Sequence, residues 1–284
     1  MNELKIGGGL KPHKIDGKEF NFGSIFGYPD LKELPANFLV GNPLEIKQQY
    51  ETDMCLAFTL ASVREQQEEV LLSPEYIFKR IKEIEGDWQE WGADPKTGAK
   101  AVLNGIIEKL ESPYHLEKDT RNYIANPENW NTTYDTLAEK HKTQGYFWIE
   151  AAKGLDMFDA IRSALYRFKD EKRAIASGAE WKQSWLSAEK GQIPKIYFDK
   201  TGTPHAFAII GWTEEDELIL QLSNGTRIGL QGLFYMPRSV ANKELLFALM
   251  FADYPENETK ETITYKSQIA RANWWQKFLW AIIK

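Results

Sequence analysis

The hydrophobic pattern of this 284-residue chain changes character near residue 173. Upstream of that point, apolar residues recur with a period near 3.6, which is typical of amphipathic helices. Downstream of it, short apolar runs alternate with turn residues, which is typical of strands and hairpins. Because one half favours helices and the other favours strands, the pattern predicts an α+β fold with two packed subdomains.

The individual elements follow from their apolar positions and end signals. Ser73 followed by Pro74 is a typical helix start, and Gly86 is a typical end. The pattern predicts helices over 55–69, 74–86 and 157–168, and a further helix through Ala99, Val102, Ile106 and Leu110. Strands are predicted at 174–177, 206–212, 218–222, 233–236 and 245–251. The polar stretch 112–145 predicts a loop with a short helix.

The composition along the chain suggests three parts. Residues 1–33, rich in Gly, Lys and Pro, form an irregular N-terminal arm, 34–255 the main domain and 256–284 a C-terminal extension. The extension contains an amphipathic helix with the apolar stripe Trp274, Trp275, Phe278, Leu279, Ile282 and Ile283. Such a stripe packs on its own domain or docks to a protein partner; a third reading is a membrane surface, since Trp and Lys suit an interface.

The charge pattern and the targeting signals restrict the partners and the location that we expect for this protein. The formal net charge is −6 and the charges are interspersed, which argues against nucleic acid as a partner because phosphate binding needs a basic face. The start of the chain has no apolar core of signal-peptide length, and no run approaches the roughly 20 apolar residues of a membrane helix. With a single cysteine, no internal disulfide forms. We therefore expect a cytoplasmic protein, free or part of a viral or other assembly.

The single cysteine, Cys55, stands where a loop containing Thr52 and Asp53 gives way to a helix-forming run. A cysteine at a helix start experiences the positive end of the helix dipole, which favours the thiolate over the thiol. That environment suits a nucleophile. The competing interpretation is a core residue, since free cysteine is among the most buried residue types. One thiol alone makes a poor metal site, and we expect no metal and no cofactor.

A thiolate nucleophile needs a base, and His205 is the candidate among the four histidines. His13, His115 and His141 lie in irregular or charged stretches, where a solvated surface histidine is expected. His205 lies at the entrance of the apolar strand 206–212, next to small residues, where its ring would face a cleft. It follows Cys55 by about 150 residues, a spacing typical of the papain and cathepsin pattern.

Several segments, taken in order, resemble papain-like C1 cysteine peptidases of the kind found in bacteria and their viruses. Cys55-Leu-Ala-Phe resembles the family's Cys-Trp-Ala-Phe, and Gln49 stands six residues earlier, as the family's oxyanion-hole glutamine does. The stretch 72–76 resembles the family's Leu-Ser motif, and 92–103 its glycine-rich substrate-lining loop and helix. His205-Ala-Phe-Ala-Ile-Ile-Gly-Trp resembles its histidine strand, and the glycines at 225, 229 and 232 its late turn. The match covers roughly residues 34–240.

The resemblance implies a papain-like fold with a helical left subdomain, a β-barrel-like right subdomain and an active-site cleft between them. It implies that Cys55 attacks the scissile carbonyl and that His205 forms an ion pair with it and then protonates the leaving amine. It also implies that Gln49 and the backbone N–H of Cys55 hold the oxyanion. The implied partner is a peptide or protein substrate.

The third catalytic position departs from the family's Asn-Ser-Trp-Gly. Aligning Gly225-Thr226 puts Leu222 at the asparagine position and Asn224 at the tryptophan position. Asn224 serves if the register slips by one residue pair, and Gln221 serves if the turn is one residue shorter. Asn224 before glycine is also a common turn signal with no catalytic role. The shielding tryptophan is missing from this motif, which predicts a wetter environment for His205.

The leading hypothesis is a cysteine peptidase that works through Cys55 and His205. The alternative is a catalytically weakened relative with the same fold, a structural or binding protein that docks to a larger assembly. The altered Asn-Ser-Trp-Gly region and the apolar C-terminal helix motivate that alternative.

Overall fold

The computed structural model describes residues 9–12, 20–112 except 51, 89 and 91, 120–255 except 153, 259–260 and 263–264. Its first half contains α1 (Phe22–Phe26), β1 (Phe38–Leu39), α2 (Cys55–Glu68), α3 (Pro74–Glu85), α4 (Pro95–Leu103), α5 (Thr120–Ala125) and α6 (Tyr134–Ala138). The second half contains β2 (Gly145–Trp148), α7 (Met157–Arg167), β3 (Ile175–Trp181), α8 (Gln183–Leu186), β4 (Thr203–Trp212), β5 (Glu217–Gln221), β6 (Leu233–Pro237), α9 (Arg238–Glu244) and β7 (Leu245–Ala252). Short 3₁₀ helices lie at Leu31–Glu33, Pro127–Asn129, Glu139–His141, Lys169–Glu171 and Glu189–Gly191.

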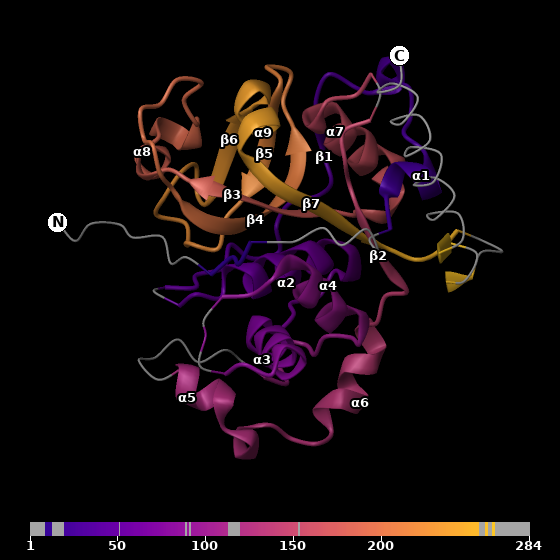
Figure 1. Cartoon of the computed structure of the whole chain (residues 1–284), viewed down its shortest axis with the longest axis vertical. Helices are drawn as coiled ribbons and strands as arrows, with labels where there is room; N and C mark the ends of the chain where they lie inside the picture. The colour runs from indigo at the N-terminus through magenta and orange to yellow at the C-terminus, as the bar shows by residue number, and fades with distance from the viewer. Residues whose placement is uncertain are drawn as a thin grey trace, which may run out of the picture.

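The strands form one antiparallel sheet in the order β2-β7-β3-β4-β5-β6, with β1 paired to the far part of β4. Figure 1 shows this sheet with α2, α3 and α4 gathered on one side. The sheet is not closed into a barrel. Its edge strand β6 receives one further bridge from Gln192, and its other edge strand β2 receives one from Asn21. The predicted α+β arrangement is confirmed, with an open sheet in the right subdomain.

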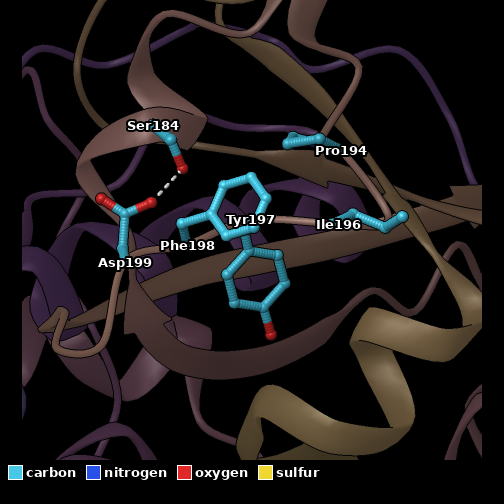
Figure 2. A pocket seen from close by; sticks show the side chains of 6 residues that line it. All are labelled: Ser184, Pro194, Ile196, Tyr197, Phe198 and Asp199. Atoms are coloured by element: carbon cyan, nitrogen blue, oxygen red, sulfur yellow. Dashed lines mark hydrogen bonds between the residues drawn. The ribbon is translucent and has the colours of Figure 1, made fainter.

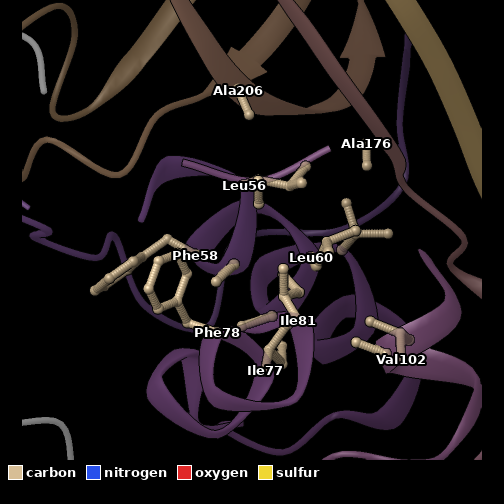
Figure 3. Packing of buried hydrophobic residues seen from close by; sticks show 14 of the residues in the cluster. Leu56, Phe58, Leu60, Ile77, Phe78, Ile81, Val102, Ala176 and Ala206 are labelled. Carbon is tan, nitrogen blue, oxygen red and sulfur yellow. The ribbon is translucent and has the colours of Figure 1, made fainter. Parts of the chain in front are cut away.

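Strand β4 separates two hydrophobic cores. Because side chains alternate along a strand, Ala206, Ala208 and Ile210 join the core that also contains α2, α3 and α4. Phe207 and Ile209 join the second core, which lies against α7, α8 and α9. Figure 3 shows the first core, in which leucines of α2 face Ala206 of β4 and Ala176 of β3. The alanines let α2 approach the sheet closely, and this brings the start of α2 to β4.

The helix starts follow the expected capping chemistry. The hydroxyl of Ser73 accepts a hydrogen bond from the N–H of Tyr76, and Pro74 occupies the first turn of α3. Asp94 and Asp156 cap α4 and α7 in the same way. Helix α2 differs, because its N-cap is Met54 and makes no side-chain cap hydrogen bond. The backbone N–H groups at the start of α2 are therefore not satisfied by a cap side chain.

Three sequence-based predictions need correction. The helix predicted through Leu110 ends at Leu103, because Gly105 adopts a left-handed φ of 96°. Leu110 is then 90% exposed. Residues 22–26 of the arm predicted to be irregular form α1, with Phe22 fully buried among aromatic rings. Strand β2 and helix α9 were not anticipated at all.

The C-terminal helix predicted over 272–284 lies outside the described residues. Within the described part of the chain, every helix is too short or too polar to cross a membrane.

Candidate active site

Cys55 is the first residue of α2, and its side chain is fully buried. Burial raises the pKa of the thiol to about 12, because a thiolate loses its solvation there. Hydrogen bonding to the sulfur from the backbone of Ala206 and Leu56 opposes this rise, while the nearby charge of Asp53 adds to it. In this closed arrangement the sulfur is therefore a thiol. The contact with Ala206 is the direct link between the start of α2 and β4.

His205 immediately precedes Ala206 on β4 and lies opposite Ala179 of β3. Its side chain is fully buried. The ring of Trp181, two residues further along β3, meets the His205 ring edge to face, with 6.1 Å between the ring centroids. The prediction of a wetter histidine is wrong, because a tryptophan from a neighbouring strand shields the ring in place of one from the late turn.

The two candidates for the third position are held by different contacts. Gln221 pairs with Ala208 of β4, and its side-chain amide donates to the backbone oxygen of Glu45 at 3.1 Å. Directly opposite residues in an antiparallel pair share a face, and neighbours along a strand alternate. Gln221 therefore shares the face of Ala208, whereas His205 points to the other face.

Asn224 lies three residues beyond Gln221, where the pairing of β4 with β5 ends. The Oδ1 atom of Asn224 is buried, and no donor among the described residues hydrogen-bonds to it. The backbone of Asn224 is held by an antiparallel bridge to Gln48, and the N–H of Gly225 donates to the carbonyl of Lys47. A buried carbonyl oxygen held in this way can accept a hydrogen bond from a ring N–H.

Gln49 is fully buried and fixed at both ends of its amide. Its Nε2 donates to the backbone oxygen of Thr52 at 2.8 Å, and its Oε1 accepts from the hydroxyl of Ser223 at 2.5 Å. Its backbone N–H also donates to the carbonyl of Ser223 at 2.7 Å. Since an amide nitrogen has two hydrogens, the second remains to bind another acceptor. Ser223 was missed by the sequence analysis.

A buried ion pair anchors this segment to α2. The ammonium of Lys47 lies 2.7 Å from Glu65, and both side chains are almost fully buried. Burial raises the pKa of Glu65, and the charge of Lys47 partly offsets this. The same carboxylate accepts the N–H of Leu72 at 2.7 Å. The loop that contains Gln49 is thus tied both to α2, which begins at Cys55, and to the turn containing Asn224.

Of the remaining histidines, His13 and His115 lie outside the described residues. His141, predicted to be a solvated surface residue, is instead 12% exposed and its Nδ1 lies 3.3 Å from a carboxylate oxygen of Glu68. The ring joins the end of α2 to the short helix that contains His141. This contact lies at the opposite end of α2 from Cys55.

Two surface hollows lie in the β half of the chain. One is lined by residues at the end of β3 and the start of β4, including Trp181, Lys182 and Thr203. Figure 2 shows the other, where the hydroxyl of Ser184 hydrogen-bonds Asp199 beside the exposed Phe198. Neither hollow includes Cys55 or His205 in its lining. The side chains of both residues are fully buried, so the candidate catalytic groups are enclosed in this structure.

Comparison with solved structures identifies the fold. Xylellain, a cysteine protease from Xylella fastidiosa, superposes with a TM-score of 0.71 and 20% sequence identity, covering 90% of this chain and 99% of that one. Digestive procathepsin L 3 of Tenebrio molitor superposes with a TM-score of 0.57 and 14% sequence identity, covering 83% of this chain and 76% of that one. The Carica candamarcensis cysteine protease CMS1MS2 superposes with a TM-score of 0.54 and 14% sequence identity, covering 78% of this chain and 100% of that one. No protein-family model matches the sequence. No curated protein matches it either. The chain has the fold of papain-like cysteine proteases.

Proposed function

We propose that this protein is a cysteine peptidase that hydrolyses peptide bonds with Cys55 as nucleophile and His205 as general base and acid. The observation that supports this most strongly is the contact between the Cys55 sulfur and the backbone of Ala206, the residue after His205. Thiol catalysis needs a base on an element next to the nucleophile, and His205 is the residue before Ala206 on β4. The solved neighbours described as cysteine proteases support the same class of reaction.

The proposed reaction proceeds through an acyl-enzyme. His205 accepts the proton of Cys55, and the sulfur attacks the carbonyl carbon of the substrate. The N–H of Cys55 and the side-chain amide of Gln49 donate hydrogen bonds to the oxyanion that forms. His205 then gives its proton to the leaving amine as the peptide C–N bond breaks. Water, deprotonated by His205, hydrolyses the resulting thioester and restores the thiol.

Asn224 is proposed to orient the His205 ring, and Gln221 is not. The register of β4 and β5, continued past Gln221, would put Asn224 opposite His205 on one face. The buried Oδ1 of Asn224 suits a ring N–H donor. The amide of Gln221 is instead engaged with Glu45. Ser223 is proposed to position Gln49, because its hydroxyl fixes the amide orientation that leaves an N–H available.

A direct test uses an epoxide-type thiol inhibitor and a peptide library. Wild type is expected to form an adduct on Cys55, located by mass spectrometry, and to cleave a subset of peptides at neutral pH. Cys55→Ala should do neither, and His141→Gln, a histidine away from the site, should do both. The peptidase proposal is contradicted if wild type and Cys55→Ala are equally inactive against the whole library and no adduct forms on Cys55.

The alternative function is a binding protein that keeps the fold without turnover. The observation in its favour is the complete burial of Cys55 and the pKa of its thiol, raised to about 12. Under that alternative, Cys55→Ala binds the same peptides as wild type and neither cleaves them. Docking through the C-terminal stripe belongs to this alternative and stays a prediction.

A further inference from the structure

Residues 190–200, here called the tip loop, lead from the short helix Glu189–Gly191 toward β4 and present two large apolar side chains to solvent. Phe198 is 91% exposed and Ile196 is 77% exposed. Among the large apolar residues that the structure describes, only Leu110 is exposed to a similar degree. A single exposed apolar residue is ordinary, whereas two on one loop indicate a surface that contacts something other than water.

The tip loop is held firmly to the rest of the domain. The N–H of Ile193 donates to the carbonyl of Tyr235 on β6 at 3.0 Å. The ring of Tyr197 meets that of Trp185 on α8 edge to face, with 5.4 Å between the ring centroids, and its hydroxyl donates to Glu244 at the end of α9. The residue between the two exposed side chains is therefore anchored to the domain, and the loop holds its two neighbours out in solvent.

A second anchor lies at the far end of the loop. Figure 2 shows the hydroxyl of Ser184 on α8 donating to the carboxylate of Asp199. Between this contact and Pro194, the loop encloses a shallow hollow of about 350 Å³, whose lining also contains the two exposed apolar side chains. Because the loop is fixed at both ends, it presents these side chains without first having to become ordered.

The tip loop is basic, although the chain as a whole carries a formal net charge of −6. Lys190, Lys195 and Lys200 are all exposed, and the loop has one acidic residue, Asp199. Glu189, just before the loop, is also exposed and offsets one lysine. Lys195 immediately precedes the exposed isoleucine, and Lys200 follows the exposed phenylalanine by two residues. The apolar pair thus lies between two lysines.

A protruding apolar pair between lysines suits the surface of an anionic bilayer. Apolar side chains enter the boundary between headgroups and acyl chains, while lysine stems bend back and keep their ammonium groups at the phosphates. A fluid bilayer deforms around a protruding side chain. A protein partner would need a cavity of matching shape for each one. The charge and the shape of the loop therefore favour lipid over protein.

We propose that the tip loop binds the surface of membranes that contain anionic phospholipids. Ile196 and Phe198 insert into the interface, and Lys195 and Lys200 contact headgroup phosphates. Binding is reversible, because two side chains and a few lysines bury less apolar surface than a stable lipid anchor does. The proposal is independent of the proposed peptidase function, since none of these residues belongs to the candidate active site.

The first test measures co-sedimentation of full-length protein with vesicles of phosphatidylcholine, alone or with an equal part of phosphatidylglycerol. Wild type should bind the anionic vesicles more tightly, and binding should weaken between about 0.05 and about 0.5 M NaCl. Phe198→Ser should weaken the apparent affinity about tenfold, because it deletes an inserted ring. Lys200→Gln should weaken it about fivefold. Lys200 is chosen over Lys195 because the charge of Lys195 also acts on Glu217 of β5.

Matched controls separate the tip loop from the remaining surface. Leu110→Ser removes an equally exposed apolar side chain on the helical side, and Lys142→Gln removes an exposed lysine. Both should bind as wild type does. Insertion itself is read from an environment-sensitive fluorophore attached to Phe198→Cys in a Cys55→Ser chain. Its emission should shift to shorter wavelength on anionic vesicles, and the same label at Leu110→Cys should not shift.

Three results would overturn the proposal. Wild type does not sediment with anionic vesicles, or Phe198→Ser and Lys200→Gln bind as tightly as wild type, or the label at position 198 stays in water on the vesicles. Retention of wild type on a polyglutamate resin, lost in Lys200→Gln and without vesicle binding, would assign the loop to an acidic protein partner instead. Each readout needs no turnover, so the outcome is separate from that of the peptidase tests.

Discussion

The two halves of the candidate site are held by different kinds of contact. Gln49 and Cys55 lie six residues apart, and Thr52 between them fixes the glutamine amide. His205 and Asn224 lie on separate segments, and the proposed contact between them requires the register of β4 and β5 to continue past Gln221. The first pair is therefore set by local structure, and the second by strand pairing. A one-residue slip in the second would turn one partner to the opposite face.

The largest expected effect comes from removing one reacting group on either side of this comparison. Cys55→Ala and His205→Ala should each lower kcat/KM for a cleaved peptide by at least about 10³-fold, since the pair acts as a unit. The double variant should be no worse than either single variant. Steady-state kinetics on purified proteins checks this, and additive losses would contradict a shared role.

The local half is tested next through Gln49. Gln49→Ala should lower kcat by about 10²- to 10³-fold with a smaller change in KM, as for loss of one oxyanion donor. Ser223→Ala should produce a smaller loss, because it frees the amide to rotate without deleting it. If Ser223→Ala is as damaging as Gln49→Ala, the hydroxyl has a role beyond positioning.

The burial of Cys55 predicts a pH dependence of stability. The pKa of the thiol in the folded chain, about 12, is above its ordinary value of 9.0, so the folded chain retains a proton that the unfolded chain loses. The contribution of the thiol to stability is therefore complete below pH 9 and is lost as the pH rises toward 12. Between pH 9 and about pH 11, the free energy of unfolding of wild type should fall by about 2–3 kcal/mol relative to that of Cys55→Ser. Urea unfolding at several pH values measures this difference. Parallel curves would show that the thiol is not enclosed in solution.

The smallest expected effect tests the register-dependent half. Asn224→Ala should lower kcat about tenfold and change the pH–rate profile, because the ring loses its proposed orienting acceptor. Gln221→Ala should leave the profile unchanged, and Asn224→Asp should retain an acceptor. The opposite ranking of Asn224 and Gln221 would mean that the register does not continue past β5.

The sequence predicted the locally determined parts of this molecule. Ser73-Pro74 marked the start of α3, and the hairpin of β4 and β5 followed from two apolar runs around a turn. Helix α4 was predicted too long, because the apolar period continues past the glycine at 105 that ends the helix. In each case the deciding signal lies within a few residues of the element.

The features that the sequence did not predict depend on residues that are distant from one another along the chain. The contact of Trp181 with His205 exists only because β3 pairs with β4, and no spacing in the sequence announces it. Ser223 becomes significant only once the loop at Gln49 lies beside it. Family resemblance predicted Cys55 and His205 as the catalytic pair, but it offered two candidates for the third residue because the motif around Asn224 differs from the family's.

The open sheet has a consequence for how this protein meets other chains. An unclosed sheet exposes rows of backbone donors and acceptors along its outer strands, which invites pairing with a second molecule. Here Tyr235 on β6 accepts the N–H of Ile193, and the N–H of Trp148 on β2 donates to Phe20. Each border is partly occupied by the chain's own loops, which hinders edge-to-edge aggregation without the need to close a barrel.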